Sequence, residues 1–280
     1  MALPAVDFTQ PAGEPALTAP DSISWQVFKN PVALFAGGVA AVILELGEPR
    51  VRTGVWEHTT FRTDPLARLE RTGLAAMVTI YGARSVAEKM IAGVRGMHAR
   101  VNGTTPRGQA YRANDPELLD WVHVTAAFGF LEAYAAFVPS VTDADRDRFY
   151  AEGVAAGRLY GAVGAPASLA EQRAQFEAMR PNLERSEIVF EFLDVMKRAP
   201  IAPSPLGPLQ WMLVRAGVEI VPGWAREILG LDDRHGLAGW ERALVSVLGA
   251  TADRVPVPGS PALQACRRLG LPVTHLYRVF

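Results

Sequence analysis

Apolar and polar positions along this chain repeat mainly with the spacing of amphipathic helices. A long apolar segment follows Asn30-Pro31 and ends at Gly47 and Pro49, which is typical of one capped helix. Further helices are predicted to begin where a capping residue precedes an apolar stretch: at Asp64-Pro65, Ser85, Asn114 or Asp115 before Pro116, Thr142 and Ser168.

Alternating patterns typical of strands are scarce. Residues 218–223 (VEIVPG) are the best short strand candidate, and residues 102–113 (NGTTPRGQAYRA) are expected to form a loop. The sequence therefore predicts an all-α fold. We expect a flexible N-terminal arm over residues 1–20, which carry four prolines, a helical domain over 21–200, and a C-terminal helical portion over 201–280 packed on the same domain.

The formal net charge of −1 argues against a general nucleic-acid binder, whose surface would be basic. The longest apolar run, Val32 to Leu44, is shorter than the ~18 residues of a candidate membrane span. The first residues lack the pattern of a secretory signal, so we expect a cytoplasmic protein.

Few residues offer metal chemistry by spacing alone. The single cysteine, Cys266, excludes an internal disulfide framework and a Cys-based cluster. The motifs typical of nucleotide binding, serine hydrolases and zinc proteases are absent from the sequence. Glu-x-x-His, the di-iron signature, is also missing before His58, His98 and His123.

What remains is one histidine on each of several predicted helices, with arginines nearby. A single histidine is enough to hold haem iron, because the porphyrin supplies four nitrogens. Apolar helices would enclose a haem, and cations such as Arg68, Arg71, Arg95 and Arg100 would bind its propionates. The alternative for each histidine is a hydrogen-bonded structural residue.

Two blocks of the sequence resemble a known family. They are LGEPRVRTGVWEHTTFRTDPLARLERT (46–72) and VRGMHARVNGTTPRGQAYRANDPELLDWVHVT (94–125). In order and spacing they are similar to the oxygenase family that shares the rubber-oxygenase catalytic domain, over about residues 25–180. Much of that family has been catalogued as a domain of unknown function.

The resemblance implies a globin-like helical core and haem b. In the rubber oxygenases a histidine three residues after an arginine is the proximal iron ligand, and Arg95-Gly-Met-His98 matches that pattern. Their Arg-x-x-Lys-Thr pattern is matched by Arg68 and Thr72, but Arg71 stands in the position of the lysine. Arginine is not deprotonated in proteins, so we do not expect a side chain at 71 to ligate iron.

Three further residues have open roles. His123 is either a core histidine or a second candidate iron ligand. Glu57 is the nearest candidate for the distal base of the rubber oxygenases, with a surface salt bridge as the alternative, and His58 is a weaker candidate.

The resemblance implies a haem-dependent oxygenase that takes dioxygen and a small apolar substrate, such as an isoprenoid-like alkene. Arg68 and Thr72 would contact oxygen or a propionate, and Glu57 would accept an allylic proton. Two alternatives stay open: a non-catalytic carrier of haem or a lipophile, and an iron-free enzyme on the same scaffold.

Overall fold

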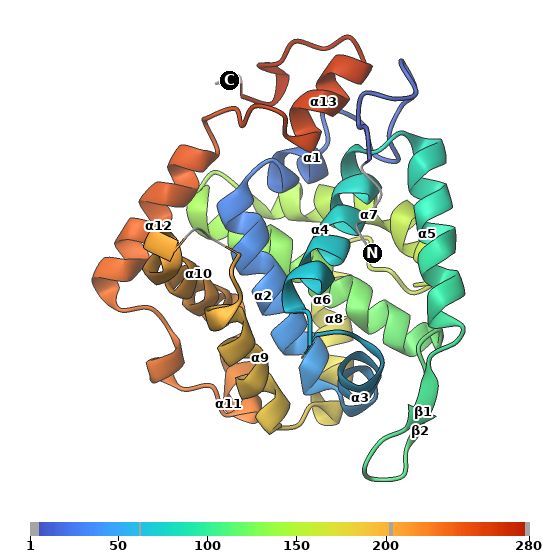
Figure 1. Cartoon of the computed structure of the whole chain (residues 1–280), viewed down its shortest axis with the longest axis vertical. Helices are drawn as coiled ribbons and strands as arrows, with labels where there is room; N and C mark the ends of the chain where they lie inside the picture. The colour runs from blue at the N-terminus through green and yellow to red at the C-terminus, as the bar shows by residue number, and fades with distance from the viewer. Residues whose placement is uncertain (1–5, 62, 202–203, 278–280) are drawn as a thin grey trace.

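The computed structural model describes residues 6–61, 63–201 and 204–277, which are almost entirely helical (Figure 1). The α-helices are α1 (Ile23–Phe28), α2 (Pro31–Gly47), α3 (Pro49–His58), α4 (Pro65–Tyr81), α5 (Arg84–His98), α6 (Pro116–Phe137), α7 (Asp143–Tyr160), α8 (Leu169–Met179), α9 (Glu187–Arg198), α10 (Gly207–Ile220), α11 (Gly223–Leu229), α12 (Gly239–Ala252) and α13 (Pro261–Arg268). Short 3-10 turns lie at Arg180–Asn182, Ser204–Leu206, Asp233–His235 and His275–Tyr277. The predicted all-α fold is confirmed.

Side-chain caps explain where several helices begin. The Asn30 carboxamide oxygen accepts from the backbone N–H groups of Val32 and Ala33 at the start of α2. Asp64 caps α4, Ser168 caps α8, and Thr142 opens α7 with a capping box. Such caps satisfy donors that the first turn leaves without a partner. These four predicted starts are confirmed.

Two local predictions are wrong. Helix α5 begins at Arg84, and the Ser85 hydroxyl donates to the carboxylate of Glu14 at 2.9 Å instead of capping the helix. Residues 218–223 are the end of α10 and the start of α11; Val218 is buried on a helix face, and none of the described strands lies in this segment.

The only described strands lie in the segment predicted as a loop. β1 (Asn102–Thr104) pairs antiparallel with β2 (Ala110–Arg112), and the hairpin projects beyond the helices in Figure 1. The Tyr111 ring holds the hairpin to the body, since it is buried against Gly54 of α3.

Helix α2 is the centre of the molecule and packs against α6 on one side and α10 on another (Figure 1). Glycines allow this close approach. A Cβ atom at Gly37 would lie 2.6 Å from the carbonyl oxygen of Gly129 on α6, and one at Gly217 of α10 would lie 2.6 Å from the Cβ of Val39. Helix α10 belongs to the C-terminal portion, which therefore shares one core with the preceding helices.

The segment before α1 lies against the body from residue 6 onward. Phe8 is buried, and the Arg268 guanidinium of α13 donates to the backbone carbonyls of Phe8 and Glu14, each at 2.8 Å. Residues 1–5 of the predicted flexible arm lie outside the described residues.

Within the described ranges, no single helix is long and apolar enough to cross a membrane. Helices α2 and α3 meet the length and composition criteria only together, with a bend of 110° between them.

Candidate active site

Glu45 is the single charged residue of α2, and it lies in the last turn of that helix. Its side chain is half-buried. Burial raises the pKa of the Glu45 carboxyl to about 7, and the positive charge of Arg68 opposes that rise. Near neutral pH the carboxyl is therefore present in both protonation states and is able to accept or return a proton.

Arg68 projects from the second turn of α4, whose start is fixed by the Asp64 cap and Pro65. Its side chain is half-buried, and its Nε has no hydrogen-bond partner among the described residues. Burial lowers the pKa of the Arg68 guanidinium, while the nearby carboxylate of Glu45 acts in the opposite direction. The guanidinium still carries its charge, because arginine does not titrate in proteins.

His98 ends α5 and is half-buried. Burial lowers the pKa of its imidazole, and the positive charge of Arg68 lowers it further. Its Nδ1 is buried and makes no hydrogen bond within the described part of the chain. The ring is thus kept neutral, with one nitrogen lone pair available to a ligand.

Three helices therefore bring one side chain each to the same region: Glu45 from α2, Arg68 from α4 and His98 from α5. The Arg68 guanidinium lowers the pKa of both Glu45 and His98. Each side chain keeps some accessible surface, yet burial is the largest influence on its pKa. The three side chains are therefore partly withdrawn from solvent, since a group on the outer surface would lose little hydration.

His123 of α6 is also half-buried, and burial lowers the pKa of its imidazole to about 4. Its ring lies against α7, where a Cβ at Gly157 would be 3.0 Å from the ring Nε2 and one at Gly153 would be 3.7 Å away. His123 is therefore a neutral histidine seated over two glycines, and Arg68 does not influence its pKa.

The other predicted residues are exposed. Thr72 shares a hydrogen bond with the Arg68 guanidinium and donates to the Arg68 carbonyl, and Arg71 donates to Thr60 at 2.8 Å. Arg95 lies outside the cluster, beside Gly161 at the end of α7.

The structure does not bring Glu57 to His98. Glu57 is exposed at the end of α3, and its negative charge helps to raise the pKa of the buried Tyr111 of the hairpin. His58, beside it, is also exposed. The carboxylate near Arg68 is Glu45, which is not among the residues predicted from the sequence. The sequence did contain an indication of this residue: Glu45 is the single acidic residue at the end of a long apolar run. A carboxylate on a buried helix is costly without a partner, so such a residue is a candidate for a functional role.

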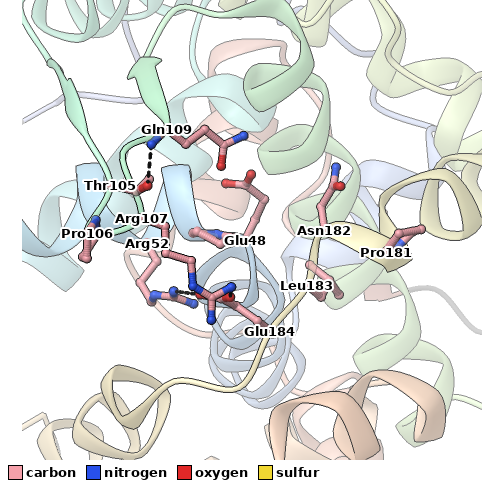
Figure 2. A pocket seen from close by; sticks show the side chains of 11 residues that line it. Glu48, Arg52, Thr105, Pro106, Arg107, Gln109, Pro181, Asn182, Leu183 and Glu184 are labelled. Carbon is pink, nitrogen blue, oxygen red and sulfur yellow. Dashed lines mark hydrogen bonds and ion pairs between the residues drawn. The ribbon is translucent and has the colours of Figure 1, made fainter.

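Figure 2 shows a separate polar cavity of about 340 Å³ between the start of α3, the hairpin and the segment before α9. The Arg52 guanidinium donates to Glu184 at 2.5 Å, and Arg107 from the hairpin pairs with the same carboxylate. Glu48 accepts from Arg50 at 2.6 Å. These charges are already paired, and none of the predicted site residues lines this cavity.

Across the described ranges, no three His, Cys, Asp or Glu side chains are grouped to hold a metal ion by themselves. A haem makes no such demand on the protein, because an axial histidine is sufficient.

Comparison with known proteins supports the resemblance. No curated protein and no solved structure matches the chain. Residues 25–253 match the family described as ER-bound oxygenase mpaB/B′/rubber oxygenase, catalytic domain. The match covers more than half of the chain and extends into its C-terminal portion. The chain therefore belongs to this family of oxygenase catalytic domains.

Proposed function

We propose that this protein is a haem b-dependent oxygenase that acts on an apolar, isoprenoid-like unsaturated substrate, by oxidative C=C cleavage or by oxygen insertion. One observation carries the proposal: Glu45, Arg68 and His98 converge in a chain that belongs to an oxygenase family. Together they provide a neutral imidazole, a fixed cation and a carboxyl with a pKa near neutrality.

The residues present fit a haem. His98 has a buried ring nitrogen without a hydrogen-bond partner among the described residues, and its lowered pKa keeps the imidazole in the neutral form that binds iron. Arg68, which acts on the pKa of His98, and the exposed Arg71 on the same helix would bind the propionates, whereas Arg95 lies toward α7. When bound, haem supplies dioxygen binding and activation, which no side chain provides.

His98 is favoured over His123 as the iron ligand. Burial keeps both rings neutral, but His98, unlike His123, has a buried ring nitrogen without a hydrogen-bond partner among the described residues and lies near the Arg68 cation. The His123 ring instead packs against Gly153 and Gly157 of α7, as expected for a structural histidine of the core.

Arg68 and Thr72 act as positioning residues. The Thr72 hydroxyl is held by the Arg68 carbonyl at 3.0 Å and contacts the Arg68 guanidinium. We expect this contact to restrict the guanidinium, so loss of Thr72 should weaken the effect of Arg68 on the pKa of Glu45 and of His98.

Glu45, rather than Glu57, is the proposed acid–base residue. Its pKa of about 7 matches the task of accepting a proton from an allylic carbon and returning it near neutral pH. The apolar surface of α2 around it, including half-buried Val42, is suited to an alkene chain.

The test is an absorption spectrum of protein produced with haem precursor, followed by dioxygen uptake with farnesol. We expect a Soret band that His98→Ala abolishes or shifts and that His58→Ala, on the exposed end of α3, leaves unchanged. Glu45→Gln should keep the Soret band and lose most of the dioxygen uptake. Saturated hexahydrofarnesol should support no uptake.

Each outcome separates the alternatives. Absence of a Soret band, even after addition of haemin, refutes haem chemistry and leaves an iron-free protein. A Soret band without dioxygen uptake on unsaturated lipids indicates a carrier. A His98→Ala protein with unchanged haem spectrum and activity removes His98 as the ligand.

A further inference from the structure

A second cavity, of about 370 Å³, lies between α6, α7, α8 and the start of α11. None of Glu45, Arg68 and His98 lines it, so it is separate from the candidate active site. Its volume is in the range of small-molecule sites.

One wall of this cavity is aromatic. The rings of Phe128 and Phe176 lie 4.9 Å apart, and Trp224 meets Phe176 edge-on at 6.2 Å. Phe176 is buried, whereas Phe128 and Trp224 are half-buried and keep ring surface exposed to the cavity. Such a wall is suited to a flat ring, which would add another offset or edge-on contact.

The carboxylates around the cavity already have cationic partners. Glu132 receives two hydrogen bonds from the Arg146 guanidinium, at 2.8 and 3.1 Å, and Asp143 lies 3.5 Å from the same group. Glu177 pairs with Arg180 at 3.6 Å, and Arg180 also covers the Trp224 ring. The acidic groups therefore have little charge left to attract a cation.

Two polar side chains that line the cavity have no partner among the described residues. Gln172 is only 3% exposed as a whole, but its carboxamide atoms keep accessible surface at the cavity and make no hydrogen bond among the described residues. An amide placed in this way is available to hydrogen-bond a ligand that enters the cavity. Arg173, next to it in the sequence, is exposed and has no carboxylate partner within the described part of the chain.

We propose that this cavity binds a planar aromatic carboxylate of one or two rings. The ring packs against the accessible surface of Phe128 and Trp224, the carboxylate pairs with the Arg173 guanidinium, and the Gln172 amide donates to it. A guanidinium and a carboxylate match in charge and in planar geometry. This site is independent of the proposed oxygenase chemistry.

The test is calorimetric titration of the full chain with 1-naphthoate, in parallel with neutral 1-naphthalenemethanol and cationic phenyltrimethylammonium. We expect saturable 1-naphthoate binding that is about tenfold weaker in Arg173→Gln, as for loss of one charge-assisted contact. Arg267→Gln is the matched control, because Arg267 is also exposed but lies on α13 away from the cavity. It should bind like the wild type.

Gln172→Leu keeps the side-chain size and removes the amide, so it should also weaken 1-naphthoate binding, with circular dichroism confirming the fold. The two other compounds should bind at least about tenfold more weakly than the carboxylate. Absence of saturable naphthoate binding overturns the proposal. So does equal binding by Arg173→Gln and Arg267→Gln, or tighter binding of the cation.

Discussion

Replacing Glu45 with glutamine should make the protein more stable above about pH 5, and the gain should be complete above about pH 7. The folded-state pKa of the Glu45 carboxyl is raised from 4.5 to about 7 by burial. Between those values the folded state keeps a proton that the unfolded state releases, so the free energy of unfolding falls as pH rises. Glutamine is isosteric and neutral, and it removes this penalty.

The magnitude follows from the size of the shift. Each unit of pKa difference is worth about 1.4 kcal/mol, so ionising Glu45 in the folded state costs about 3 kcal/mol once the pH exceeds 7. Urea unfolding of both proteins at several pH values measures the difference directly. Glu45→Gln and wild type should be nearly equal at pH about 4 and differ by about 3 kcal/mol at pH about 8.

Glu57→Gln is the matched control, because Glu57 is an exposed glutamate on the neighbouring helix. Its stability difference from wild type should stay small across the same range. A flat difference for Glu45→Gln, or one that favours the wild type above pH 7, would refute the claim that burial raises the pKa of this carboxyl.

Three further predictions concern other parts of the fold. As the pH falls from about 7 to about 5, the free energy of unfolding of His123→Gln should rise by about 2 kcal/mol relative to wild type. The reason is that the unfolded chain takes up a proton at His123, whereas the folded-state pKa of about 4 keeps the buried ring neutral. A pH-independent difference would contradict this. Gly129→Ala should lower the thermal midpoint, with a loss of at least about 1–3 kcal/mol, because its Cβ would lie 2.4 Å from the carbonyl oxygen of Gly37 on α2. Arg107→Gln removes a largely exposed partner of Glu184 and should cost less than about 1 kcal/mol in urea unfolding; a larger loss would show that the hairpin is held chiefly by this ion pair.

The helices could be read from the sequence because their starts depend on local chemistry. An Asn30 or Thr142 side chain caps its helix through backbone groups two or three residues away. Ser85 shows where that reasoning stops. Its spacing fits a capping box, but Glu14, distant in sequence, lies close enough to take its hydrogen bonds.

The candidate site was only partly predictable for the same reason. Arg68 and His98 were identified from the family pattern, and the structure places the guanidinium where it lowers the pKa of the imidazole. Glu57 was chosen as a base by proximity in sequence, but the turn after α3 leaves it exposed. Glu45 is farther from Arg68 in sequence, and the packing of the helices brings the two together.

By itself, the sequence determined the helical class, most helix starts and the family, because these depend on neighbouring residues and on recurring patterns. Only the tertiary structure decided which side chains share a low-dielectric space. Burial depends on every helix packed around a group, and it gives Glu45 and His123 pKa values far from those of the free side chains. The same packing leaves Gln172 buried without a partner among the described residues, which no local pattern in the sequence indicates.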